Sequence, residues 1–390
     1  MPRLKTVPYG RQQIEAADIQ AVREVLASDF ITQGPKVDEF ERALADYCGA
    51  EYAVAVSSGT AALHLAALAA GLKKGDEAIT TPITFLATSN AMLYAGAIPV
   101  FADIDYETVN LDPRAVKKQI SSKTKAIFPV DFAGLPAAMP EISALAKRRR
   151  LMVIEDASHA LGAEYRQGRV GSCKYSDMTI FSFHPVKHIT TGEGGAITTN
   201  RRDLYEKLKA LRSHGVWRSE ETRQKIGGWY YEMRELGFNY RITDFQCALG
   251  LAQLKKLDRF LEKRRQIAQR YDAAFSKLKS LKVPAQRFDG QKHAYHLYLL
   301  RLQVKNPKQV RRALYDRLRT HGIHAQVHYI PIYHQPFYRS LFNGKRPQCP
   351  NAERYYEEVL SLPMFPDLKP VEQSHIIQTV KNFLAEAKSR

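Results

Sequence analysis

The chain has 390 residues, 45% of them hydrophobic and 25% charged, which is the composition of an ordinary globular protein. A chain of this length is longer than one small domain needs, which predicts a large domain at 1–250 and a smaller C-terminal domain at 251–390. The most apolar stretch, 60–72, is too short to span a bilayer, and the N-terminus lacks the apolar core of a signal peptide. We therefore expect a cytoplasmic protein with no membrane partner.

The charge balance predicts an anionic partner. Lys and Arg number 58 against 40 Asp and Glu, a net charge of +18. The positive charge is spread along the chain and no nucleic-acid-binding motif is present, so we do not expect nucleic acid. A substrate and a cofactor that carry phosphate account for the same sign. The four cysteines are far apart in sequence, which predicts reduced thiols and no metal site.

Residues 16–27 and 37–48 carry apolar residues at helical spacing and are predicted to form amphipathic helices. From residue 52 onward, apolar runs of strand length alternate with helical segments, which predicts a mainly parallel sheet. After Thr243 one helical pattern continues to about residue 278 and leads into the second domain. The predicted strands are 52–56, 77–80, 97–101, 125–130, 151–154, 178–183, 195–199 and 298–304, and further helices are 84–95, 138–149, 308–321 and 371–388.

Two motifs follow predicted strands. Ser57, Ser58, Gly59 and Thr60 precede a helix, whose first turn offers free N–H groups to a phosphate; a simple N-cap by Ser58 is the alternative. Asp156, in the Glu155–His159 motif, lies at the carboxyl end of a strand, where α/β enzymes place ligands. An Asp there can pair with a pyridine nitrogen of a cofactor, or it can cap the next helix.

A third motif centres on Lys187, which follows an apolar strand and precedes a glycine-rich turn. Most lysines are solvated, but an amine in an apolar loop has a lowered pKa and can attack an aldehyde. Ser182, five positions earlier, can bind a phosphate oxygen. Phe85 begins a predicted helix, where its ring can stack on a flat cofactor or simply join the core.

In order and spacing these motifs resemble the DegT/DnrJ/EryC1/StrS sugar aminotransferases, from about Tyr9 to the C-terminus. The resemblance implies the type I aminotransferase fold, with helices on both faces of the mainly parallel sheet and a smaller α+β domain. It implies pyridoxal 5′-phosphate (PLP), bound to Lys187 as a Schiff base, and an obligate homodimer. The implied cofactor-binding residues are Ser58, Gly59, Thr60, Phe85, Asp156, His159, Ser182, Lys187 and, toward the neighbouring subunit, Asn239.

Within the family, four segments resemble the PseC group, the UDP-4-amino-4,6-dideoxy-N-acetyl-β-L-altrosamine transaminases of pseudaminic acid synthesis. These segments are 129–134, 158–162, 182–187 and 325–329, and Asp131 stands where many other members carry His. His188 and Ile330 depart from the pattern, which expects Pro and Lys there. The implied sugar-nucleotide contacts are Tyr9, Asp29, Phe30, Ile31, Thr32, Gln326, Val327, His328 and Tyr329.

The sequence thus predicts transfer of an amino group from L-glutamate to C4 of UDP-2-acetamido-2,6-dideoxy-β-L-arabino-hex-4-ulose. Another keto nucleotide sugar is the alternative substrate. A related dehydratase would carry His in place of Lys187. A non-catalytic binding protein of the same fold and an aminotransferase for amino acids alone complete the alternatives.

Overall fold

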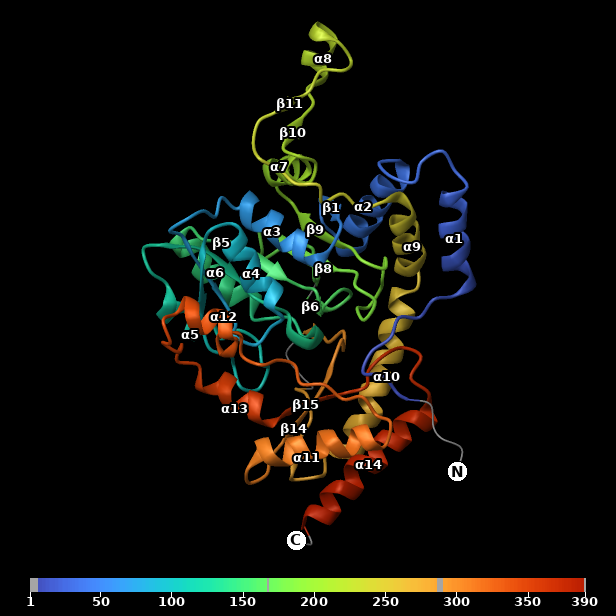
Figure 1. The fold of residues 1–390 in the computed structure, drawn as a ribbon, viewed down its shortest axis with the longest axis vertical. Helices are drawn as coiled ribbons and strands as arrows, with labels where there is room; N and C mark the ends of the chain where they lie inside the picture. Colours follow the sequence, from blue (N-terminus) through green and yellow to red (C-terminus); the bar gives the residue numbers. More distant parts are fainter. Residues whose placement is uncertain (1–5, 167, 286–289, 389–390) are drawn as a thin grey trace.

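The computed structural model describes residues 6–166, 168–285 and 290–388. A seven-stranded sheet forms the centre of the larger part of the molecule, in the order β1-β9-β8-β5-β4-β2-β3 (Figure 1). Strands β3, β2, β4, β5 and β8 run parallel, whereas β9 is antiparallel to both of its neighbours. The strands are β1 (Tyr52–Val56), β2 (Glu77–Thr80), β3 (Ile98–Phe101), β4 (Thr124–Phe128), β5 (Met152–Asp156), β8 (Met178–Ser182) and β9 (Gly195–Thr199).

Both faces of this sheet are buried because its strands are apolar on both sides. In β1, Val54 and Val56 pack on one face, whereas Ala53 and Ala55 pack on the other, as the two-residue period of a strand requires. The mainly parallel sheet with helices on both faces is therefore confirmed. Helices α3 (Gly59–Ala69), α4 (Leu86–Tyr94) and α7 (Arg202–Arg212) cover the first face, and α2 (Pro35–Cys48), α5 (Pro113–Gln119), α6 (Met139–Arg149) and α9 (Asp244–Leu254) the second.

The smaller C-terminal part has a core of its own beneath the large sheet (Figure 1). An antiparallel sheet in the order β12-β14-β15 packs against helices α10, α11 and α14. The domain boundary at residue 250 stays a prediction. The N-terminal segment also contacts the smaller part, because Val7 pairs with Ile323. The elements of the smaller part are α10 (Leu257–Phe275), β12 (Leu281–Lys282), β14 (Tyr298–Leu302), α11 (Pro307–Thr320), α12 (Pro336–Leu341), α13 (Pro350–Glu358), β15 (Val359–Leu362) and α14 (Pro370–Lys388).

The single helix predicted for 243–278 is wrong in one respect, because α9 and α10 are separate helices divided at Lys255 and Lys256. The Lys256 ammonium pairs with the fully buried Asp18 of α1 (Ala16–Leu26) and with Glu15 before it. This contact links the break between α9 and α10 to α1, which packs along α9. Helical spacing in sequence cannot reveal an ion pair at this break to a residue 238 positions away.

An arm projects from the large part at the top of Figure 1. It consists of β10 (Val216–Trp217), α8 (Glu220–Ile226) and β11 (Glu232–Met233). The remaining small elements are β6 (Glu164–Tyr165), β7 (Gly168–Arg169), β13 (Gln291–Lys292) and the 3₁₀ turns Phe132–Gly134 and Ile332–His334. In the described ranges no helix is both long and apolar enough to cross a bilayer.

Strand direction brings the predicted motifs to one edge of the sheet. β5 ends at Asp156 and β8 ends at Ser182, and these strands are parallel. β1 runs in the same direction, since both β1 and β8 are antiparallel to β9, so Ser58 follows β1 at the same edge. The carboxyl ends of parallel strands are where such folds bind ligands.

Candidate active site

A cavity of about 570 Å³ opens at this edge of the sheet. It lies between the strand ends of the large part and the 326–329 segment of the C-terminal part. The structure brings most of the predicted site residues to its wall, although their roles stay predictions. Those residues are Tyr9, Ser58, Gly59, Thr60, Phe85, Asp156, His159, Ser182, Lys187, Gln326, Val327, His328 and Tyr329.

Lys187 reaches the cavity from the loop that follows β8, where its backbone N–H donates to the carbonyl of His184 at 2.9 Å. Lys187 is half-buried at the wall of this cavity. Desolvation by the protein around it lowers the pKa of Lys187 to about 8, although the negative charge of Asp156 opposes the shift. About a tenth of the amine is then neutral at pH 7, several hundred times more than for a solvated lysine.

Asp156 is 4% exposed and is held by three hydrogen bonds. The Thr88 hydroxyl donates to one carboxylate oxygen at 2.7 Å, and the Ser158 hydroxyl and N–H donate to the other at 2.6 and 3.1 Å. In the described chain no helix directly follows Asp156, so the alternative that it caps the next helix is wrong; its carboxylate instead closes the turn at Ser158 and lies at the cavity wall. Thr88 was not predicted, but it lies three residues after Phe85 on α4, so helical spacing places both on one face.

The N-terminus of α3 faces the same cavity. Ser58 caps the helix by accepting from the N–H of Ala61, so the N–H groups of Gly59 and Thr60 are the first-turn donors left for an anion. Gly59 packs directly on Ser182, because a Cβ on Gly59 would come within 2.8 Å of the Ser182 Cβ. The helix end and the Ser182 hydroxyl therefore form one compact corner whose donors suit a phosphate.

Aromatic side chains line the remaining walls. The Phe85 ring stays 58% exposed and lies 6.3 Å from the Tyr329 ring, measured between ring centroids. The His159 ring is 4% exposed and roughly parallel to the Tyr329 ring, at 24°. Burial and the nearby Lys187 ammonium hold the pKa of His159 well below its ordinary value, so this ring is neutral.

These features fit PLP. The α3 end suits its phosphate, the Lys187 amine suits its aldehyde, Asp156 suits a protonated ring nitrogen, and exposed Phe85 suits its flat ring. The fit rests on the chemistry of the residues that share this cavity.

Five predicted residues lie outside the cavity of their own chain. Asn239 is exposed after the arm, and Thr32 forms a bridge to Thr243 instead of reaching the cavity. The others are Asp29, Phe30 and Ile31, which are exposed as well. A single chain therefore leaves these contacts unmade, and their roles stay predictions.

The two departures from the family pattern lie in different surroundings. His188 is buried behind Lys187, where its Nε2 lies 3.1 Å from the carbonyl oxygen of Ala294. Ile330 is 44% exposed and is not part of the cavity wall, although it directly follows Tyr329.

Asp131 forms a buried carboxyl pair with Glu155 next to the cavity. Asp131 Oδ1 accepts from the N–H of Ala137 at 2.8 Å, whereas its Oδ2 finds no donor among the described residues. Burial and the neighbouring Glu155 charge raise the pKa of Asp131 well above its usual range, and burial also raises the pKa of Glu155. We infer that the two carboxyls hold one proton between them, which would give the unpaired oxygen a partner. Because the Asp131 N–H donates to the carbonyl of Asp156, the pair supports the cavity wall.

Comparison with known proteins identifies the kind of site. Residues 12–381 match the DegT/DnrJ/EryC1/StrS aminotransferase family. The UDP-4-amino-4,6-dideoxy-N-acetyl-β-L-altrosamine transaminase of Campylobacter jejuni serotype O:23/36 is 42% identical over 389 residues, covering 98% of both chains. PseC of Helicobacter pylori, an aminotransferase of pseudaminic acid biosynthesis, superposes with a TM-score of 0.90 at 35% identity, covering 98% of this chain and 100% of its own. Spr1654 of Streptococcus pneumoniae, solved in PMP and PLP forms, is 29% identical with TM-scores of 0.90 and 0.89, covering 97–98% of this chain and 99% of its own.

The pKa of Lys187 predicts how the cofactor-free enzyme captures PLP. We expect the rate of covalent attachment to rise about tenfold per pH unit below pH 8 and to level off above it, because only the neutral amine is a nucleophile. Stopped-flow absorbance measures this rate. A solvated lysine derivative under the same conditions is the reference, and its rate should keep rising toward pH 10. A plateau at the same pH for both would contradict a desolvated Lys187.

The shared proton predicts a pH-dependent stability. A carboxyl whose folded pKa is raised contributes stability that is complete below its unfolded pKa, near 4, and is lost as pH rises through its folded pKa. Asp131→Asn can donate to Glu155 without a titrating proton and still accept from Ala137, so its advantage in melting temperature over the natural protein should grow from pH 5 to pH 8. Asp131→Ala, which leaves the Ala137 N–H unpaired, should destabilise by about 1–3 kcal/mol at every pH. Parallel melting curves for Asp131→Asn and the natural protein would refute the shared proton.

Proposed function

The chain belongs to the DegT/DnrJ/EryC1/StrS aminotransferase family, and from this membership we propose that it aminates C4 of UDP-2-acetamido-2,6-dideoxy-β-L-arabino-hex-4-ulose, with L-glutamate as the donor. The protein is a PLP-dependent sugar aminotransferase. The observation that carries the proposal is a partly neutral lysine, Lys187, that shares one cavity with Asp156 and the phosphate-binding end of α3.

The position of each cavity residue indicates its role in the proposed reaction. PLP, when bound, supplies the electron sink that stabilises the charge left when a proton leaves carbon. Lys187 Nζ, with its pKa of about 8, can take up such a proton from the donor and return one to the acceptor. Asp156 is fixed by Thr88 and Ser158, so its negative charge is held in place facing the cavity. Phe85 and Tyr329 contribute aromatic surface to the cavity wall, and the exposed Phe85 ring is free to cover a flat cofactor.

The substrate is proposed from the similarity to the altrosamine transaminase and to PseC, which covers nearly the whole chain. The segment 326–329, which resembles the sugar-nucleotide contacts of that group, lines the cavity together with Tyr9. Tyr9 lies 5.6 Å from His328 between ring centroids, so the N-terminal segment and the C-terminal part form one wall. Amination of another 4-keto or 3-keto nucleotide sugar is the alternative, since Ile330 removes the cation expected beside this wall.

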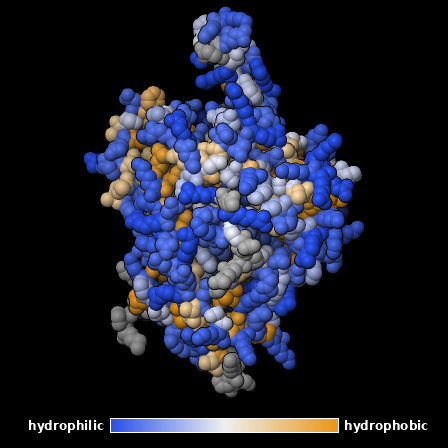
Figure 2. Space-filling model, turned by 180° about the vertical axis from the view of Figure 1, so that it is seen from behind, coloured by the Kyte–Doolittle hydropathy of each residue, from blue (hydrophilic) through white to orange (hydrophobic). Residues whose placement is uncertain are grey.

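We also propose a homodimer with shared active sites. The arm carries exposed apolar side chains, which in a monomer would lie in water: Ile226, Trp229, Tyr231, Met233 and Leu236 are each at least 50% exposed. Figure 2 shows further hydrophobic surface on the side where α1 lies, and Phe30 and Ile31 after α1 are 56% and 51% exposed. A second copy that covers both surfaces would bring Asn239 and residues 29–32 to a neighbouring cavity.

The substrate proposal is tested with the purified enzyme, glutamate and the 4-keto sugar nucleotide. We expect the amino sugar and 2-oxoglutarate in equal amounts, and at least about tenfold slower turnover of the C5 epimer. Lys187→Ala should lose at least about a thousandfold in rate because it removes the group that moves the proton. Lys36→Ala, which changes a surface lysine paired with Glu39, is the matched control and should be fully active. Preference for the epimer would redirect the proposal to the alternative sugars.

The dimer proposal predicts that the arm is required for assembly. Trp229→Ser combined with Leu236→Ser removes two of its most exposed apolar groups, at 78% and 76% exposure. We expect a monomer by analytical ultracentrifugation and loss of most activity. Val371→Ser, which changes a 63% exposed residue on α14, should stay dimeric. A dimer that survives the double change with full activity would refute the role of the arm.

A further inference from the structure

Three buried histidines from three separate segments meet behind the cavity. His159 follows β5, His188 follows Lys187, and His296 precedes β14, and each is only 3–4% exposed. The His159 and His296 rings lie 4.3 Å apart between centroids at 34°, and the His296 and His188 rings lie 5.6 Å apart. Only His159 lines the cavity, so the other two have no role in the proposed chemistry.

The backbone holds His296 rigidly in this row of three histidines, His159, His296 and His188. Its N–H donates to the carbonyl of Ala133 at 2.9 Å, and the buried Arg264 donates to its carbonyl and to that of Tyr295. Gly134, with φ 99°, packs so closely on His159 and His296 that a Cβ there would come within 2.9 Å of the His159 carbonyl oxygen and 3.1 Å of the His296 N–H nitrogen. The segments that carry the two rings are thus clamped together.

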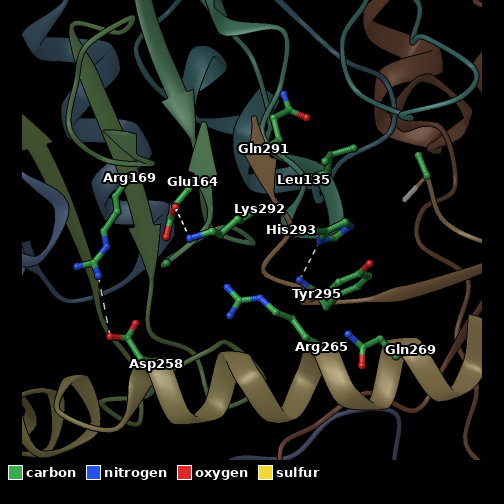
Figure 3. A pocket seen from close by; sticks show the side chains of 12 residues that line it. Leu135, Glu164, Arg169, Asp258, Arg265, Gln269, Gln291, Lys292, His293 and Tyr295 are labelled. Carbon is green, nitrogen blue, oxygen red and sulfur yellow. Dashed lines mark hydrogen bonds and ion pairs between the residues drawn. The ribbon is translucent and has the colours of Figure 1, made fainter. Parts of the chain in front are cut away.

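A turn at 293–296 separates His296 from its neighbours. His293 and Tyr295 stack on one another with ring centroids 4.0 Å apart, and the Tyr295 N–H donates to His293 Nδ1 at 2.8 Å (Figure 3). They line a separate polar cavity of about 540 Å³, beside Arg265 and Gln269 of α10. Tyr295 has a positive φ of 48°, so the chain turns there, and the His296 ring packs on His159 instead of joining this cavity.

Hydrogen bonding assigns the protons of the row. His188 Nε2 faces the carbonyl of Ala294 and must donate, since a carbonyl only accepts. The Nδ1 atoms of His159 and His296 are buried and have no partner in the described part of the chain. An unpaired buried N–H is more costly than an unpaired buried acceptor. Both rings therefore carry their proton on Nε2, which for His159 lies on the Tyr329 side, 3.5 Å from that hydroxyl.

The row is also neutral. Burial comes first among the causes that lower the pKa of all three rings, and positive neighbours add to it. Lys187 faces the row from the β8–β9 loop and Arg264 faces it from α10, so an added proton would be repelled from both sides. His328, on the cavity wall, is neutral as well, because burial lowers its pKa to about 3.

We propose that His296 is a positioning residue: backed by His188, it fixes the plane of the His159 ring and keeps the His159 proton on Nε2, so that the cavity is offered one immobile N–H donor. This inference rests on the proposed cofactor site. A tilted ring packed 4.3 Å away restricts rotation of its neighbour, and it helps to bury the partnerless Nδ1 of His159, where a proton would be left without an acceptor. A misplaced donor in a binding site costs about tenfold to a hundredfold in rate.

The test compares His296→Ala, which removes the stacking ring, with His296→Phe, which keeps a flat ring without nitrogen. In His296→Ala we expect the His159 ¹⁵N signals of selectively labelled enzyme to report a tautomer mixture, and the pH at which the visible band of bound PLP titrates to shift. We expect kcat to fall about tenfold with KM within twofold. His296→Phe should keep the pH at which the PLP band titrates, and most of kcat, as they are in the natural enzyme. His188→Ala should change the titration pH and kcat in the same direction as His296→Ala, but by a smaller amount.

His375→Ala is the matched control, because His375 and His321 form an exposed ring pair in the C-terminal part, with centroids 6.2 Å apart. It should change neither the PLP titration nor kcat. If His296→Ala leaves the His159 signals and the PLP titration unmoved, the positioning role is wrong, even where the melting temperature falls. Should His296→Ala fail to fold, the same readouts on His296→Phe and His188→Ala decide the matter. A natural enzyme with no visible PLP band would instead refute the proposed cofactor site.

Discussion

The site depends on partial desolvation of the Lys187 amine beside the Asp156 carboxylate. Desolvation lowers the pKa of Lys187, and the charge of Asp156 opposes the shift, so the value of about 8 is a balance between the two. The balance requires a rigid wall, since an amine that could swing into water would regain its ordinary pKa. The wall is rigid because Asp156 and Ser182 lie at the last residues of two paired, fully internal strands.

Order along the chain predicted the parts of the site that lie next to strands. Asp156, Ser58 and Lys187 each follow an apolar run, and the rule that parallel strands end at one edge brings them together. Contacts between distant segments leave no such pattern. The packing of His296 on His159 joins residues 137 positions apart, and the pairing of Lys256 with Asp18 lies at a break in a helix that spacing predicted as continuous. Thr88 was not predicted, although its position three residues after Phe85 could have been read from helical spacing.

Buried titratable groups around the site avoid charge more than they balance it. Burial raises the pKa of Asp131 and Glu155 and lowers the pKa of the three imidazoles, so the neutral forms are favoured. Arg264 differs: burial lowers its pKa to about 10, three carbonyl oxygens accept from its Nη1, and its Nε and Nη2 have no partner among the described residues. Much of the net positive charge of the chain therefore lies elsewhere, on the exposed surface, where it can attract a phosphate-bearing substrate.

One chain supplies the chemical centre of the site but not its outer rim. The exposed arm, Asn239 and the 29–32 segment lie beyond the cavity of their own chain, and the first and last of these carry apolar side chains that water solvates poorly. Burying these surfaces against a second copy would therefore stabilise the dimer and complete the rim in the same event. In the proposed dimer, substrate recognition would use this rim and would therefore depend on assembly more than proton transfer at Lys187, whose neighbours in the cavity come from a single chain.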